Sequence, residues 1–185
     1  MSLADMSWKR VSVHAMVAAF LRSEQHKIAG AWPPALATPD LSNPQQNHQR
    51  LRYLLLIRRL LIGEIPPDTD WYEVRNLTDA DLTHLHVIAR CGWDDPRDRN
   101  ELHQVAARRR EPLLKPPTEW PPVILWGHQP SGPFTIIEGN HRLIAYAASG
   151  SRGGLAITIL VGLSPTPCFW HVFDQCGKLA NDLWL

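Results

Sequence analysis

The pattern of apolar and polar positions divides the chain into an N-terminal part with helical periodicity and a later part with strand-like runs. Residues 7–29 place valine, alanine and leucine at intervals of three and four, which predicts a helix with one apolar face. Leucine and isoleucine repeat at a similar spacing between residues 45 and 62, and Gly63 supplies a C-terminal stop for this second helix. The turn-rich stretch 30–47 predicts a loop between them.

The middle of the chain predicts one strand and two further helices. The strand is expected at Trp71–Val74, where apolar and aromatic residues follow a pair of prolines. A signal resembling a capping box precedes apolar residues at helical spacing between residues 78 and 89, which predicts a helix there. Another helix is expected from about residue 98, before a stiff, proline-rich connector that ends at Pro122.

The last third of the chain predicts a small sheet. Val123–Trp126 and Phe134–Ile137 are apolar runs joined by a segment with proline and glycine, which is typical of a hairpin. A helix is expected over residues 140–149, followed by strands at Leu155–Val161 and Cys168–Phe173. The whole pattern predicts an α/β (α+β) fold in which N-terminal helices pack against a small mixed sheet.

Length, charge and cysteine content narrow the classes of protein. A chain of 185 residues is expected to form one domain, with an N-terminal helical part, 1–63, and a core, 64–185. The net charge of +1 gives the whole molecule no strong attraction to nucleic acid, and the apolar runs are too short for a membrane span. The three cysteines are scattered, which favours a reducing, cytoplasmic compartment. Cys168, His171 and Cys176 would supply only three ligands, so no metal site is predicted.

The segment from Phe134 to Gly150 carries the candidate chemistry. Gly139 follows an apolar strand and permits a bend with positive φ and the close approach of a ligand to the backbone. A helix that starts here would present its first amides, at residues 140–142, with the positive end of its dipole. Arg142 can grip two oxygens and His141 can donate to an anion or transfer a proton. This arrangement suits an anion, and a phosphate above all.

Glu138, the carboxylate of this segment, leaves several roles open. It can hold Arg142 in place, bind a metal ion or act as a general base. The plain structural alternative is that Glu138 and Arg142 only pair and that Asn140 only caps the helix. The candidate catalytic residues are Glu138 and His141, and the candidate phosphate-binding residues are Gly139, Asn140, His141 and Arg142.

This segment and its flanking strands resemble the N-terminal domain of the ParB family, within the ParB/sulfiredoxin superfamily. The resemblance covers residues 122–161. It comprises a strand that begins Pro-Val, a variable hairpin, a strand that ends Glu-Gly-Asn-His-Arg, and a helix with an aromatic residue and alanines, followed by a glycine and another strand. A ParB/sulfiredoxin-like fold is what this resemblance implies for the core.

The resemblance implies binding of a nucleotide at the turn, CTP as in partition proteins or ATP as in sulfiredoxins and related kinases, with Mg²⁺ as a possible companion. Gly139, His141 and Arg142 would contact the phosphates. Sulfiredoxins have their catalytic cysteine where this chain has Asn140, so reduction of a sulfinic acid is not expected. Partition proteins continue into DNA-binding and dimerisation domains, and too few residues follow the third strand here for either.

Two other functions remain open. The first is a DNA-binding, plasmid-partition-related module without catalysis, in which a basic helix face and an arginine run contact the DNA backbone; a solvated surface is the alternative explanation of these charges. The second is an interaction partner that uses some of the eight tryptophans as a contact surface. The candidate DNA contacts are Arg50, Arg52, Arg58, Arg59, Arg108, Arg109 and Arg110.

Overall fold

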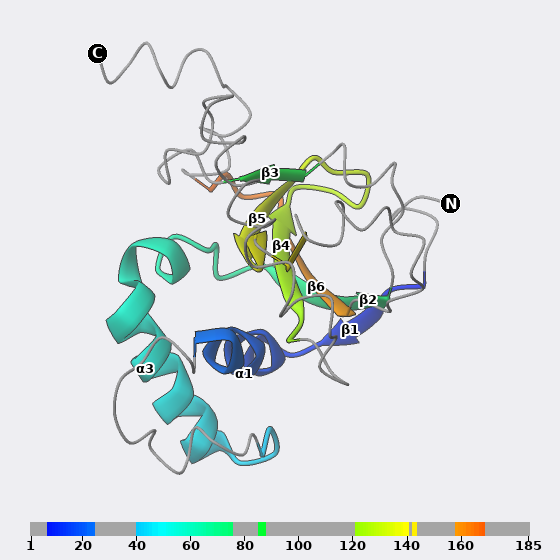
Figure 1. Cartoon of the computed structure of the whole chain (residues 1–185). Coiled ribbons are helices and arrows are strands. Elements are labelled where there is room, and N and C mark those ends of the chain that lie inside the picture. The colour runs from blue at the N-terminus through cyan, green and yellow to red at the C-terminus, as the bar shows by residue number, and fades with distance from the viewer. Residues whose placement is uncertain are drawn as a thin grey trace, which may run out of the picture.

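The computed structural model describes residues 7–24, 40–75, 85–87, 121–140, 142–143 and 158–168. These residues form two helices and one sheet of six strands (Figure 1). In chain order the elements are β1 (Lys9–Val11), α1 (Val13–Glu24), α3 (Pro44–Ile62), β2 (Asp70–Arg75), β3 (Leu85–Val87), β4 (Val123–Gly127), β5 (Phe134–Glu138) and β6 (Thr158–Leu163).

The sheet is mixed, with strand order β1-β2-β6-β4-β5-β3. Strand β4 runs parallel to β6, and β3 runs parallel to β5, while the other neighbouring pairs are antiparallel. A mixed sheet combined with helices confirms the α+β class expected from the sequence. The predicted hairpin is also confirmed, because β4 pairs antiparallel with β5 directly across the connecting turn.

Both faces of the sheet are covered by apolar side chains, which explains why β4 is a continuous apolar run rather than an alternating one. Ile124 and Trp126 face the core shared with the two helices, whereas Val123 and Leu125 belong to a second cluster. All five residues of β4 are buried. The strand therefore forms the centre of the fold and fixes the position of the neighbouring β5.

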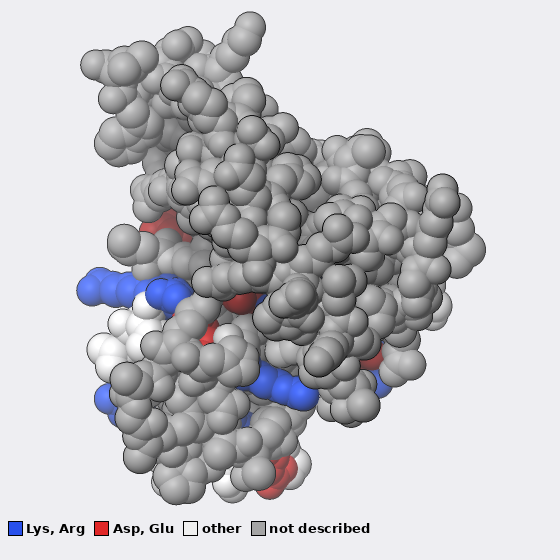
Figure 2. All heavy atoms as spheres, in the orientation of Figure 1, with Lys and Arg blue, Asp and Glu red and all other residues white. Residues whose placement is uncertain are grey.

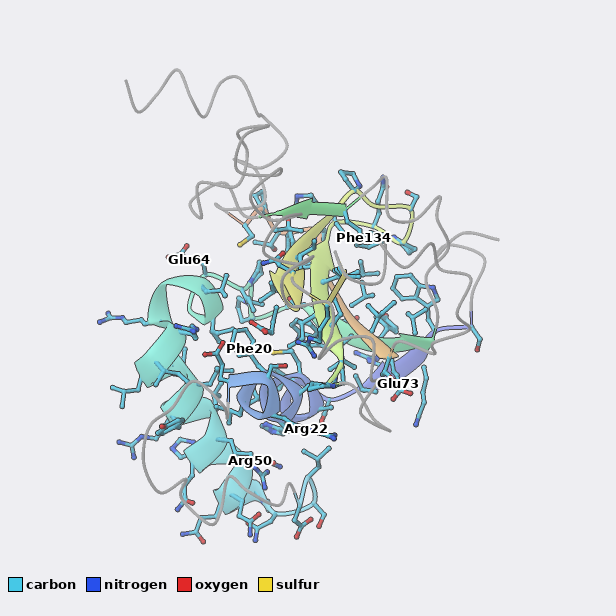
Figure 3. The ribbon with its side chains drawn as sticks, in the orientation of Figure 1. Phe20, Arg22, Arg50, Glu64, Glu73 and Phe134 are labelled. Carbon is cyan, nitrogen blue, oxygen red and sulfur yellow. The ribbon has the colours of Figure 1, made fainter. Side chains whose placement is uncertain are left out.

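Helix α1 lies between α3 and the sheet (Figure 1). Phe20 points from α1 into the core and is 0% exposed (Figure 3). Two of the described tryptophans, Trp71 and Trp126, are also buried in this core, and Trp8 packs edge-on against Tyr72. These three tryptophans are therefore packing residues, and the other five lie outside the described residues.

Local signals account for the bounds of α3. The side chain of Asn43 accepts a hydrogen bond of 3.1 Å from the Gln46 amide, and Pro44 occupies the first helical position. The Gly63 amide donates to the Arg59 carbonyl at the other end. The predicted helix and its stop at Gly63 are confirmed, although this glycine has a right-handed φ of −68°.

Two predicted helices are wrong in part, because short strands replace helical residues. Lys9–Val11 pairs with β2 as an edge strand, and α1 begins only after Ser12, whose hydroxyl accepts from the Ala15 amide. Leu85–Val87 pairs in parallel with β5. In both places hydrogen bonding to a neighbouring strand outweighs the helical spacing, which three residues cannot establish by themselves.

Of the remaining predictions, two strands are confirmed, and several segments lie outside the described residues. The strand at Trp71–Val74 is confirmed, and the strand expected at Leu155–Val161 is β6, shifted toward the C-terminus. Cys168 is buried outside any strand, and its thiol donates to the Glu64 carbonyl. The predicted helix from residue 98, the proline-rich stretch 112–120, and residues 169–173 lie outside the described residues. Within the described ranges, no helix is both long and apolar enough to cross a membrane.

Candidate phosphate-binding site

The candidate turn follows the end of β5, as the sequence predicts. Gly139 has a φ of +102°, and its carbonyl accepts a hydrogen bond of 3.0 Å from the Leu143 amide. This bond makes Gly139 the cap and places Asn140 at the first helical position. Arg142 and Leu143 continue the helical turn, and His141 lies outside the described residues.

Only glycine fits at position 139, for two separate reasons. Its positive φ is strained for any residue with a side chain. A Cβ there would also lie 3.0 Å from Cγ2 of Val123 and 3.1 Å from Nη2 of Arg142. The bend therefore packs closely against the start of β4 and against the Arg142 guanidinium.

The Gly139→Ala substitution is expected to reduce the free energy of unfolding by about 1–3 kcal/mol, the usual cost of one residue held in a disfavoured backbone conformation. Urea denaturation followed by circular dichroism measures the change. A loss below about 0.5 kcal/mol, the range of neutral surface substitutions, would show that the bend does not need its positive φ.

The guanidinium of Arg142 is buried, and both of its terminal nitrogens donate to protein oxygens. Its side chain is 12% exposed. Nη1 donates to the main-chain carbonyls of Pro121 and Pro122, and Nη2 donates to Ser23 Oγ at 2.8 Å and to Glu138 Oε1 at 3.4 Å. Burial lowers the pKa of Arg142 while the neighbouring carboxylate opposes this shift, and the group stays a cation at neutral pH.

Arg142 therefore fastens α1 and the start of β4 to the turn. From the sequence, the Arg142 guanidinium is expected to bind a ligand. In the structure it donates to protein acceptors instead. Ser23 and the carbonyls of Pro121 and Pro122 are the positioning groups that sequence reasoning missed. Ser23 lies 119 positions away along the chain, so no local pattern could have found it.

The roles expected for Glu138 and Asn140 separate in the structure. Glu138 pairs with Arg142 across one helical turn, as the plain structural alternative expects. Asn140 does not occupy the cap position, because the Gly139 carbonyl accepts the first intrahelical hydrogen bond and Asn140 follows it. Within the described part of the chain, the buried Oδ1 of Asn140 has no hydrogen-bond partner.

Among the residues that the structure describes, metal-ligating side chains do not gather at this turn. Across the described ranges, no group of three or more histidine, cysteine, aspartate or glutamate side chains can hold a metal ion.

The basic face expected on α3 is divided in the structure. Arg50 is 1% exposed and lies near the start of α3 (Figure 3), where its guanidinium donates to protein oxygens. Arg58 pairs at 2.5 Å with the buried Glu24 of α1. Arg58 itself has non-helical φ and ψ inside α3. Arg52 and Arg59 are exposed. The acceptors of Arg50 are Asn47 Oδ1, Gln46 Oε1 and the Asp40 carbonyl.

The positive charges of the described residues are scattered on the one face that Figure 2 shows. Arg108, Arg109 and Arg110 lie outside the described residues. On the face seen in Figure 2, the lysine and arginine side chains of the described residues stand apart from one another. The DNA-contact hypothesis thus keeps two of its four arginines on α3.

Ser164, His128 and Asp68 lie together at the end of β6 but do not form a nucleophilic site. The Ser164 hydroxyl donates to Asp68 at 2.7 Å, and the His128 ring nitrogen contacts the Ser164 carbonyl rather than the hydroxyl. Hydrogen bonds from Ser164 and Thr166 hold the pKa of Asp68 below its usual range. These contacts clamp the loop before β2 to the end of β6.

Comparisons with known proteins leave the resemblance as a hypothesis. No family model matches the chain, and no curated protein or solved structure is significantly similar to it. The proposed function therefore rests on the geometry of the turn and on the residues between 122 and 161.

Proposed function

We propose that the protein binds a nucleotide through its phosphate groups at the turn 138–142, as a ParB/sulfiredoxin-like protein would. The observation that carries the proposal is the bend at Gly139, which ends β5 and starts a helical turn at once. Neither the Asn140 amide nor the Arg142 amide donates to another described residue. Amides at the start of a helix are suitable donors for phosphate oxygens.

In this proposal Arg142 contributes a positive charge and holds the turn in place, and its guanidinium does not itself bind two phosphate oxygens. Its Nη2 would lie 3.1 Å from a Cβ at Gly139, so a fixed positive charge stands directly behind the bend. The pairing with Glu138 offsets part of that charge but leaves the guanidinium in place. Phosphate oxygens would therefore meet main-chain amides first, with the positive field of a buried cation behind them.

The other residues of the turn divide the remaining tasks. In this proposal His141 supplies the side-chain donor to the phosphate, and Asn140 contributes its main-chain amide. Glu138 and His141 are the candidate general bases if the bound phosphate is hydrolysed or transferred. The nucleotide is ATP or CTP.

Calorimetric titration with ATP and with CTP, each with Mg²⁺, tests this proposal. The expected result is saturable binding of at least one nucleotide, weakened about tenfold by the His141→Ala substitution, since one charge-assisted hydrogen bond is lost. Arg52→Ala, which changes an exposed arginine on α3, is the control and should bind as tightly as the wild type. Absence of heat with both nucleotides, in protein shown to be folded by circular dichroism, would overturn the proposal.

DNA binding without catalysis, in a plasmid-partition-related role, is the second candidate. It is favoured by the exposure of Arg52 and Arg59 on α3. If both contact DNA phosphates, replacing each with glutamine should flatten the dependence of log K on log salt concentration by about 0.9. Electrophoretic mobility shifts at rising salt measure this slope, and a slope unchanged by both substitutions would remove the candidate.

A further inference from the structure

A cavity of about 510 Å³ lies between the start of α1, the second half of α3 and the loop that leads into β2. Most of its lining is apolar, and its polar side chains come from the residues around β1 and β2. The principal apolar side chains are Met16, Leu51, Leu55, Ile62, Ile65 and Trp71. Arg10, Ser12, Thr69 and Asp70 are the polar ones.

This cavity is separate from the turn at 138–142. None of its described lining residues belongs to that turn. Ser12, which precedes α1, lines the cavity, whereas Ser23 at the other end of the helix contacts Arg142. At about 1.5 Å per residue, roughly 16 Å of chain along α1 separates Ser12 from Ser23. Ligand binding in the cavity can therefore be tested independently of the proposed nucleotide site.

The size and lining of the cavity fit a small molecule with an apolar body. Ligand sites are commonly about 300–1,000 Å³, mostly apolar, and carry a few polar groups that fix the orientation of the ligand. Met16, Ile62 and Trp71 are buried, so their side chains are held in place by the core behind them. A chain of methylene groups placed against them would leave water for an apolar environment.

Two hydroxyl groups of the lining are placed to donate to a ligand. Ser12 Oγ accepts from the Ala15 amide at 3.3 Å, and Thr69 Oγ1 accepts from Trp126 Nε1 at 3.2 Å. Among the residues that the structure describes, neither hydroxyl donates a hydrogen bond in turn. Their protons therefore suit an acceptor atom of a bound molecule.

Arg10, which also lines the cavity, adds a third donor. It pairs with Asp70, and the two side chains are 72% and 48% exposed. Exposed ion pairs of this kind contribute little stability, so the guanidinium can exchange its partner for a ligand carboxylate while Asp70 turns to water. Three hydrogen-bond donors that line one cavity favour a ligand with an anionic head group, such as a carboxylate.

We propose that this cavity binds a small monocarboxylate with an apolar tail. The tail lies against Met16, Leu55 and Trp71, and the carboxylate accepts hydrogen bonds from Arg10, Ser12 and Thr69. The site is distinct from the nucleotide site, and the proposal does not depend on nucleotide binding.

Titration calorimetry with decanoate, decanol and decylamine tests the proposal on the full chain. Decanoate is expected to bind with one-to-one stoichiometry and about tenfold more tightly than decanol, because one charge-assisted hydrogen bond distinguishes the two. Decylamine is expected to bind no more tightly than decanol. The Arg10→Gln substitution should lower the affinity for decanoate to the affinity for decanol.

A matched pair of substitutions on α3 locates the site. Leu55→Trp fills the cavity and should weaken decanoate binding about tenfold or more, while Leu56→Trp changes a neighbouring side chain that is 79% exposed and should have no effect. Ile65→Trp replaces Leu55→Trp if the latter does not fold, as judged by circular dichroism. Equal decanoate affinity in both tryptophan variants, a preference for decylamine, or binding that does not saturate at one molecule would each overturn the proposal. Nucleotide titration of the same variants should match the wild type, which separates this result from the nucleotide proposal.

Discussion

Replacement of Arg142 with methionine is expected to lower the free energy of unfolding by about 3–5 kcal/mol, the usual loss when one partner of a buried ionic network is removed. The methionine fills a similar volume but donates no hydrogen bonds. It would leave the Glu138 carboxylate and the Ser23 hydroxyl without their shared donor, and two main-chain carbonyls before β4 would lose the same partner. Urea denaturation at neutral pH, followed by circular dichroism, measures the loss.

Arg52→Met is the matched control for this substitution, because Arg52 is an exposed arginine on α3. It should change the free energy of unfolding by no more than about 0.5 kcal/mol. Arg142→Lys should fall between the two, since a single ammonium group keeps the charge but cannot donate in four directions fixed by a planar head. Equal losses in the Arg142→Met and Arg52→Met variants would show that the observed hydrogen bonds do not stabilise the fold.

The anchoring role of Arg142 changes how variants of the turn should be interpreted. Loss of nucleotide binding in an Arg142 variant would follow either from a missing ligand contact or from a displaced turn. A substitution of His141 that keeps wild-type stability is therefore the cleaner test of contact with phosphate. Arg142→Lys adds a second readout, because it retains the charge behind the bend while removing part of the anchor.

Local chemistry made several parts of the fold predictable. The α3 bounds follow from an asparagine cap, a proline at the first position and a glycine stop. The hairpin of β4 and β5 follows from two apolar runs separated by turn residues. The positive φ of Gly139 follows from a glycine between a strand and a helical segment. In each case the residues that decide the conformation are neighbours in the sequence.

Long-range contacts account for most of what the sequence did not show. Strands β1 and β3 have three residues each, and they exist because β2 and β5 offer them hydrogen-bonding edges. Arg50 belongs to a run of arginines that a helix surface could explain. Its side chain is nevertheless buried, and it donates to two side chains of its own helix and to a main-chain carbonyl of the preceding loop. The acceptors around Arg142 come from three separate segments. Periodicity and charge patterns cannot report such partners, because they depend on how distant elements pack.

Replacement of Phe20 with alanine is expected to cost about 3–5 kcal/mol, the range observed when a buried phenylalanine leaves a cavity. Phe20 is 0% exposed, and it packs in the cluster that joins α1 and α3 to the helix-facing side of the sheet. A chain of this size should melt about 10 °C lower as a result. Thermal unfolding followed by circular dichroism checks the shift.

The effect of Phe20→Ala should reach beyond stability, because α1 carries Ser23 against the candidate turn. Looser packing of α1 should weaken nucleotide binding in the variant even at temperatures where it stays folded. Leu56→Ala provides the control, since this leucine is 79% exposed on α3 and its loss removes little buried surface. A melting temperature for Phe20→Ala as close to the wild type as that of Leu56→Ala would contradict the placement of α1 between α3 and the sheet.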